Sequence, residues 1–420
     1  MNRRSMVSLA LQAMAVGPLA AACGPTQQTP GAGTPAAGGA TSGTIKIVSS
    51  LPRTGTDKGQ TDTMVNAFRM ALDEVNAKVG NFTLTYEDWD DATAAAQKWD
   101  PAQETANANK AAADKDIMVY LGTFNSGAAK LAIPILNQAG PLVMISPANT
   151  YPGLTKKVGA EAGEPDKYYP TKIRNYTRVV PADDIQGAVA AQWAKDLGAA
   201  KVYILDDQEL YGKGIADVFE ASAKKLGLNV LGHEGINPKA AEYKAVMNKI
   251  KALNPDLIYY GGITANGAGQ LVKDKIGAGM PAEQVKFMGP DGIYENAFIE
   301  SAGKENAEGV YATFGGVPPD KLTGKPLEWA NRYREKYGGA LEAYTIYAYE
   351  AMKVALDAIE RAGRKDRRAI RDAVFTTKNF TKGVLGTWSF DENGDTTITT
   401  MSGGQVRGAQ LTFQKELTAK

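Results

Sequence analysis

The chain has 420 residues, of which 44% are hydrophobic and 22% are charged, as is typical of a globular protein long enough for two ordinary α/β domains. A net charge of +1 provides no basic field, so nucleic acid and anionic membrane surfaces are not expected as partners. Because His233 and Cys23 are the only histidine and cysteine, the sequence lacks the residues for Ser-His-Asp or Cys-His catalysis, multi-histidine zinc sites and an internal disulfide.

The first residues have the pattern of an exported precursor. Arg3-Arg4 precede a weakly apolar run over residues 6–16, which at about 11 residues is too short to span a bilayer. The following Leu-Ala-Ala-Ala-Cys, which ends at Cys23, resembles the lipobox of bacterial lipoproteins, whose cysteine thiol carries diacylglycerol. We therefore expect a signal peptide over residues 1–22 and a lipid on Cys23. An ordinary secretory signal with an incidental cysteine is the alternative.

A flexible tether is expected next, so that residues 23–43 comprise the lipidated cysteine and a linker. Residues 24–43 contain only glycine, proline, alanine, threonine, serine and glutamine. Such a segment cannot bury enough apolar surface to order itself.

From residue 44 onward, strands and helices alternate in two successive runs. In the first run, strands are expected over 45–49, 82–86, 117–121 and 142–146, with helices over 64–75, from Asp100-Pro101 onward and over about 127–138. In the second run, strands are expected over 202–205, 230–231, 257–260 and 287–288, with helices over 214–226, 241–253 and 267–276. This alternation indicates two parallel sheets, each covered by helices on both faces.

The last third of the chain follows a different pattern. It is expected to contain a strand over 310–314, helices over about 327–337, 343–362 and 366–375, and strand-like segments over 386–390 and 410–413. Asn393-Gly394 indicates a turn between the last strands.

Three glycine-rich stretches follow predicted strands, but none completes a nucleotide-binding motif. The stretch 122–127 opens a helix as a phosphate-binding loop does, yet it lacks the lysine of that loop. The stretch 212–214 is followed by Asp217 where the dinucleotide fingerprint needs its third glycine, and Gly261-Gly262 matches neither motif. We therefore expect no nucleotide and no other cofactor.

What these stretches share is a position at the carboxyl end of a parallel strand, where open α/β sheets bind ligands. Asn125 and Ser126 begin a helix and present a hydroxyl group and free backbone N–H groups, an arrangement that suits a carboxylate. Residues 146–150 supply another hydroxyl group at the end of the next strand. Ordinary helix caps and turns explain the same pattern equally well.

No metal site is expected from the sequence. The acidic run over residues 87–91 lacks EF-hand spacing and fits a solvated strand end better than a cation site. His233 is expected in an exposed loop between a short strand and a turn.

The segment LGTFNSGAAKLAIPILNQAGPLVMISPANT at 121–150 resembles the leucine/isoleucine/valine-type substrate-binding proteins of ABC transporters, in the type I periplasmic-binding class. Further segments agree in the same order, namely SLPRTG at 50–55, YGKGIADVF at 211–219, DLIYYGG at 256–262, FMGPDGI at 287–293, AEGVYATF at 307–314 and SFDENGD at 389–395. The similarity covers residues 44–420.

The resemblance implies an α/β fold of two Rossmann-like lobes with parallel sheets, joined by a three-segment hinge. One lobe would comprise residues 44–180 plus 316–378, and the other would comprise residues 181–315 plus 379–420. The lobes would close on a ligand held between them.

It also implies a ligand site that combines groups from both lobes. Ser126, the backbone at Ala148 and Thr150 match positions that hold the carboxylate of an amino acid, with Asn125 beside them. From the other lobe come an acidic partner for the ammonium group, a second polar position and an aromatic wall, at Asp291, Asp183 and Tyr211.

Three departures from the family pattern put branched-chain specificity in doubt. Ile263 occupies a position that is aromatic in the family, and Lys58 stands where a tyrosine is frequent. The segment 156–177 is longer than amino-acid binders need. Binders of urea, amides and aromatic acids therefore remain alternatives.

The expected function is that of an extracytoplasmic, lipid-anchored receptor that delivers an amino acid or a similar small molecule to the membrane subunits of an ABC permease. The lipid would be its only contact with the membrane. A ligand sensor of the same fold, which signals and transports nothing, is a second possibility. An enzyme is not expected, because the chain lacks a catalytic constellation.

Overall fold

The computed structural model describes residues 38–339 and 341–418. The predicted signal peptide, Cys23 and most of the predicted linker lie outside the described residues. The chain divides into a unit ending at Gly38 and a unit formed by Gly39–Lys420, and the second of these carries all the elements below.

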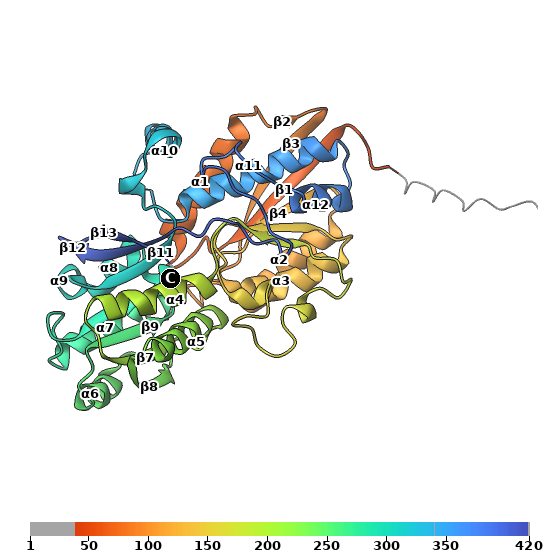
Figure 1. Ribbon diagram of the computed structural model, residues 1–420. Helices are drawn as coiled ribbons and strands as arrows, with labels where there is room; N and C mark the ends of the chain where they lie inside the picture. Colours follow the sequence, from red (N-terminus) through yellow and green to blue (C-terminus); the bar gives the residue numbers. More distant parts are fainter. Residues whose placement is uncertain (1–37, 340, 419–420) are drawn as a thin grey trace, which may run out of the picture. The chain divides into compact units, whose positions relative to one another are not determined.

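The first sheet has the strand order β2-β3-β1-β4-β5-β6. Its strands are β1 (Gly43–Leu51), β2 (Lys78–Val79), β3 (Phe82–Asp90), β4 (Ile117–Gly122), β5 (Val143–Ser146) and β6 (Tyr176–Arg178). Figure 1 labels its strands β1 to β4. All neighbours are parallel except β2 and β3. Parallel strands need crossover connections, and helices supply them here.

Helices cover both faces of this sheet, as the sequence predicts. They are α1 (Lys58–Asp73), α2 (Pro101–Ala113), α3 (Ser126–Gln138), α11 (Thr345–Ala362) and α12 (Arg367–Phe375). In β1, Ile45 and Ile47 join the apolar cluster that contains α1 and α11, whereas Val48 joins the cluster that contains α2 and α3. This alternation follows from the two-residue period of a strand.

The second sheet has the order β13-β12-β11-β10-β9-β7-β8. Its strands are β7 (Lys201–Asp206), β8 (Asn229–Gly235), β9 (Leu257–Gly261), β10 (Lys286–Gly289), β11 (Tyr311–Gly315), β12 (Met401–Arg407) and β13 (Gln410–Leu417). The strands from β8 to β11 are parallel, and β12 and β13 complete the sheet as an antiparallel pair.

The helices between β6 and α10 (Gly324–Tyr337) pack mainly on this second sheet. They are α4 (Asp183–Asp196), α5 (Leu210–Lys225), α6 (Lys244–Ala252), α7 (Ala268–Gly277), α8 (Asn296–Ala302) and α9 (Lys304–Ala307). By contrast, α10 contacts α1. Single turns of 3-10 helix occur at Pro152–Leu154, Asp166–Tyr168, Thr264–Asn266, Asp291–Ile293 and Pro319–Lys321.

The chain passes between the two sheets three times: from β6 to α4, from β11 to α10, and from α12 to β12. The two-sheet α/β class with a three-segment hinge is therefore confirmed. The lobe boundaries themselves stay a prediction. Trp388, which lies beyond the proposed boundary at residue 378, donates from Nε1 to Glu350 of α11 at 2.7 Å.

Three local predictions differ from the structure. Residues 386–390 form no strand; Phe380 with Trp388, and Phe390 with Thr396, make only single bridges. β12, which the sequence analysis did not predict, contains Gly403 and Gly404. His233 lies within β8 and is half-buried, not in an exposed loop.

Candidate functional site

A small cavity lies where the two sheets present the carboxyl ends of their strands. Its lining comes from loops that follow β4, β5, β9 and β10, from the start of α5 and from the residue before α11. The lining residues are Phe124, Asn125, Ser126, Ala148, Thr150, Tyr211, Ile263, Asp291, Gly292 and Tyr344. The enclosed volume of about 30 Å³ leaves room for about two water molecules, so the two sides are closed on one another.

One side of the cavity presents hydrogen-bonding groups at a helix start. Ser126 is the first residue of α3, and Asn125 is its N-cap residue but makes no side-chain cap bond. Asn125 Oδ1 and Thr150 Oγ1 are buried without a hydrogen-bond partner within the described part of the chain. Backbone N–H groups at a helix N-terminus carry partial positive charge. This side therefore suits an anionic group.

The other side presents Asp291, which begins a short 3-10 turn after β10. Its Oδ1 accepts hydrogen bonds from Gln186 Nε2 at 2.5 Å and from Tyr211 OH at 2.8 Å. Its Oδ2 accepts from the hydroxyl group of Tyr344. Burial raises the pKa of Asp291 above its ordinary value, while these three donors act in the opposite direction.

A second carboxylate, Asp183, is buried beside this cavity. It is the first residue of α4, and its backbone N–H donates to Thr150 O at 2.9 Å. Within the described residues, both of its carboxylate oxygens and the nearby Thr150 Oγ1 lack hydrogen-bond partners, although the Thr150 hydroxyl group acts to lower the pKa of Asp183. Burial, followed by the charge of Asp291, raises the pKa of Asp183 well above its ordinary value.

Two buried carboxylates thus lie close together with no ion-pair partner among the described residues, although the charge of Arg178 acts on Asp183. Over the residues that the structure describes, neither Asp183 nor Asp291 forms an ion pair with lysine, arginine or histidine. Burying an unpaired charge costs several kcal/mol, roughly, unless a proton or a cation neutralises it. The arrangement therefore favours a ligand that brings positive charge to this side.

The structure brings together all the predicted site residues except Asp183 as lining of one cavity, and Asp183 is buried and bonds through its backbone N–H to Thr150, which is one of the lining residues. Whether they bind a ligand stays a prediction. Lys58, by contrast, begins α1 and pairs with Asp62 at the surface. Sequence reasoning missed Phe124 and Tyr344 as lining residues. Their only signal was an aromatic side chain beside a predicted strand end or helix start.

Polar contacts also join the two sides around the cavity. Lys98, from the loop before α2, bonds through Nζ to Glu209 Oε1 and Asn266 Oδ1, both at 2.7 Å. Gln60 of α1 donates from Nε2 to Glu295 Oε2 at 3.0 Å. Since these partners come from elements of different sheets, the contacts hold the closed arrangement.

A buried ion pair supports the loop that carries Thr150. Arg178, at the end of β6, donates from Nε to Asp395 Oδ1 at 2.6 Å. Its Nη1 donates to Tyr151 O at 2.8 Å and to Asn149 O at 3.2 Å. Arg178 therefore fixes the backbone on both sides of Thr150.

The long segment predicted over residues 156–177 packs around Glu164. This buried carboxylate accepts hydrogen bonds from Tyr151 OH at 2.7 Å and from Tyr168 OH. The segment also reaches α4, where Lys156 Nζ lies 2.9 Å from Asp184 Oδ1. The additional length thus encloses the loop behind the cavity.

A larger cavity, of about 470 Å³, lies near the hinge, between residues 316–326, the start of α11 and residues 381–400. Its lining is mostly apolar, and its one charged residue is Lys325, whose Nζ donates to Thr381 O at 2.9 Å. Within the described residues it has no unpartnered buried polar atom to orient a ligand. The smaller cavity is therefore the better candidate.

No helix among residues 38–339 and 341–418 combines the length and the apolar character needed to cross a bilayer.

Comparison with known proteins agrees with this geometry. Residues 44–410 match the family described as periplasmic binding protein. The Leu/Ile/Val-binding protein homolog 2 of Brucella abortus is 30% identical over 368 residues, which are 86% of this chain and 90% of that protein. Homolog 1 of the same organism is 33% identical over 297 residues, which are 70% of this chain and 73% of that protein.

A solved structure shows the same fold. The leucine-binding protein LivK of Thermotoga maritima superimposes with a TM-score of 0.77 at 25% sequence identity. The superposition covers 89% of this chain and 99% of that one.

Proposed function

The chain belongs to the periplasmic binding protein family, and we propose that it is an extracytoplasmic receptor that captures an amino acid between two lobes and delivers it to an ABC permease. Its named relatives are Leu/Ile/Val-binding protein homologues, which supports an amino acid of branched-chain type or a related small carboxylate or amide. The proposed role includes no catalytic step.

The observation that carries this proposal is that a buried acid and hydroxyl groups at a helix start line the same small cavity from different sheets. On one side, Asp291 lines the cavity and the buried Asp183 lies close to it, and neither forms an ion pair within the described residues. On the other side, Ser126 and Thr150 offer hydroxyl groups at the start of α3. An amino acid zwitterion needs an acid at one end and donors at the other, so it complements both sides at once.

Binding would proceed by opening and closing of the lobes. We assign residues 44–180 plus 316–378 to one lobe and residues 181–315 plus 379–420 to the other. A ligand that contacts Ser126 and Asp291 together bridges the lobes, so it stabilises the closed form by its differential affinity for that form.

The two buried acids also disfavour an aromatic acid as the ligand. A benzoate-like aromatic acid carries a carboxylate but no cation, so it brings no positive charge to Asp291 and leaves both oxygens of Asp183 without a partner among the described residues. Amides and urea offer N–H donors to these acids and stay as a second ligand class. A sensor of the same fold would bind the same ligands, and only the partner would differ.

We propose a lipid on Cys23 as the attachment to the membrane. Residues 24–43 would then keep the receptor close to its permease while it reorients, which raises the local concentration for docking. A Cys23→Ala form is expected in the soluble fraction of cells. A variant that stays with the membrane contradicts the anchor but not the ligand site.

A thermal-shift screen tests the ligand class. A ligand that binds only the folded state raises the melting temperature by mass action. We expect at least one free amino acid to raise it, and its deaminated analogue to leave it unchanged. A screen in which carboxylic acids without an amino group give the only shifts would contradict the proposal.

A further inference from the structure

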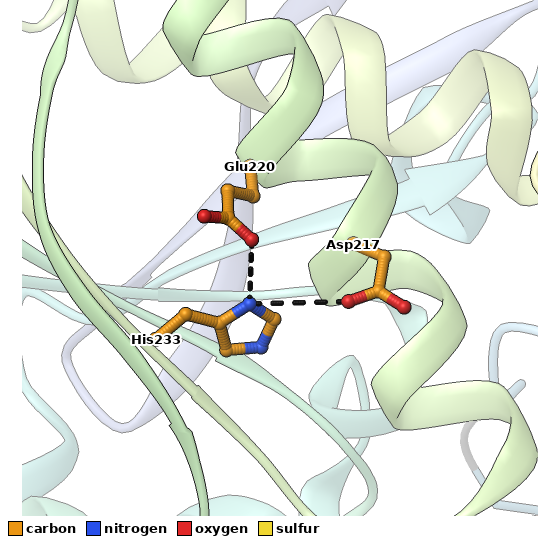
Figure 2. A group of neighbouring side chains, drawn as sticks. All are labelled: Asp217, Glu220 and His233. Atoms are coloured by element: carbon orange, nitrogen blue, oxygen red, sulfur yellow. Dashed lines mark hydrogen bonds and ion pairs between the residues drawn. The ribbon is translucent and has the colours of Figure 1, made fainter.

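A second cluster of chemically competent side chains lies outside the cleft, between α5 and the edge strand β8. Figure 2 shows that the imidazole of His233 faces the carboxylates of Asp217 and Glu220. Nδ1 of His233 lies 2.8 Å from Glu220 Oε2 and 3.9 Å from Asp217 Oδ1. The three atoms all lie within 4.8 Å of one another.

The backbone places these groups together without strain. Asp217 and Glu220 are three residues apart on α5, so they project from the same face of the helix. His233 lies on β8, where alternate side chains point to opposite faces of the sheet. Its neighbour Glu234 points to the other face and binds Tyr203 and Lys249.

The other ring nitrogen of His233 is held by a third carboxylate. Nε2 lies 3.1 Å from Oδ2 of Asp206, at the end of β7. Asp206 is fixed in turn, because its Oδ1 accepts from the backbone N–H of Gln208 at 2.7 Å. In metal-binding histidines a carboxylate commonly accepts the proton of one ring nitrogen, which leaves the other nitrogen for the metal ion. Without an ion, Nδ1 of His233 carries a proton and donates it to Glu220 Oε2.

Two lysines occupy the remaining carboxylate oxygens. Lys213 Nζ binds Asp217 Oδ2 at 2.5 Å, and Lys224 Nζ binds Glu220 Oε1 at 2.6 Å. Each lysine thereby leaves the second oxygen of its partner, Oδ1 or Oε2, directed at Nδ1 of His233. A bare lone pair on Nδ1 would be repelled by these oxygens, so either a proton or a metal cation lies between them.

The cluster is also accessible from solvent. The side chain of Asp217 is 47% exposed, whereas that of Glu220 is 23% and that of His233 14% exposed. An ion can therefore enter from the side of Asp217 and keep water as a further ligand.

We propose that Asp217, Glu220 and His233 form a binding site for Zn²⁺, with Asp206 as the residue that orients the imidazole ring. One imidazole nitrogen and two carboxylate oxygens match the ligand types that Zn²⁺ takes, and a position left to water completes its coordination. Binding would join α5 to β8. A proton on Nδ1, bound between the same oxygens, is the competing occupant of the cluster.

Calorimetric titration of the purified chain with ZnCl₂ tests the site, without any ligand in the cleft. We expect one equivalent of Zn²⁺ to bind and to raise the melting temperature. Asp217→Asn and His233→Gln should each remove this binding, and Asp206→Asn should weaken it by about 10–100-fold. Glu234→Gln, which alters the opposite face of β8, is the matched control and should bind zinc as the unaltered chain does.

The exposed position of Asp217 makes Asp217→Asn a variant that is expected to fold. If the unaltered chain does not bind zinc stoichiometrically, the proposed site is wrong. A proton on Nδ1 of His233 then lies between the carboxylate oxygens instead of a metal ion. Zinc binding that persists in both Asp217→Asn and His233→Gln would overturn the proposed site as well. Neither result bears on the cleft ligand, which is measured separately.

Discussion

Asp291, from the second sheet, accepts a hydrogen bond from the hydroxyl group of Tyr344, which precedes a helix packed on the first sheet. A residue of the proposed ammonium site is thus bonded across the hinge in the closed form. An incoming ammonium group would compete with Tyr344 for Asp291 and would bring the positive charge that the tyrosine hydroxyl lacks.

Asp291→Asn tests this role of the carboxylate. The variant keeps the shape of the side chain but loses the charge, so binding of an amino acid should weaken by about 2–5 kcal/mol, as for a buried charge pair that loses one partner. Isothermal titration calorimetry measures the change. Asp372→Asn, on the exposed face of α12, is the control and should not alter affinity. An unchanged dissociation constant for Asp291→Asn would refute the ammonium assignment.

Ser126→Ala tests the carboxylate end. Ser126 is buried at the first position of α3, and its hydroxyl group is expected to donate to the ligand carboxylate. Loss of that bond should weaken binding by about 1–3 kcal/mol. Ser301→Ala, whose hydroxyl group bonds within α8 to Phe298 O, should bind normally. Equal affinity of the two variants would mean that Ser126 acts only as a helix start.

Two further buried acids, Asp57 and Glu295, should make the stability of the closed form depend on pH. Burial raises the pKa of Asp57 to about 7 and that of Glu295 to about 8, while Lys98 acts on Asp57 in the opposite direction. Solvated carboxylates in an open form titrate near their ordinary values, about 4. The closed form therefore binds more protons between about pH 4 and pH 8, so its stability falls as the pH rises through that range.

Glu295→Gln removes one of these titrating groups and keeps an acceptor for Gln60. Its melting temperature should fall less than that of the unaltered chain between about pH 5 and pH 8. The difference between the two chains isolates Glu295 from the other buried acids. If the melting temperatures of the two chains fall equally with pH over this range, Glu295 does not contribute to the pH dependence.

Arg178→Met tests the support of the Thr150 loop. The substitution leaves Asp395 buried without its cation and frees the carbonyl groups of Asn149 and Tyr151. Unfolding in denaturant should show a loss of about 3–5 kcal/mol. Arg332→Met removes a surface pair with Glu74 and should cost less than about 1 kcal/mol. A similar small loss for both variants would show that Arg178 does not stabilise the fold.

The sequence predicted those site residues that lie directly after a predicted strand or at the start of a predicted helix. Ser126 and Asn125 follow a strand and begin a helix, so the geometry of a parallel sheet alone directs them to the cleft. Tyr344 gives no such signal, because it reaches the cavity only through the packing of α11 on the first sheet. A contact across the hinge depends on residues that are distant along the chain.

The predictions of secondary structure that were wrong also have specific physical causes. Residues 386–390 alternate like a strand, but Trp388 is directed to Glu350 and Phe380 instead of along a sheet. In β12, Gly403 and Gly404 lower the strand propensity of the sequence. The structure requires them because a Cβ atom at either would lie 2.7 Å from the ring of Trp193 or Tyr294.

The central claim is that the cleft recognises both charges of a zwitterion, and calorimetry with a matched set of three ligands tests it most directly. The set comprises the amino acid found by the screen, the same compound without its amino group, and its carboxamide. We expect the free amino acid to bind at least tenfold more tightly than either analogue, since each analogue leaves one side of the cleft without its partner. Equal binding of the deaminated acid would contradict it.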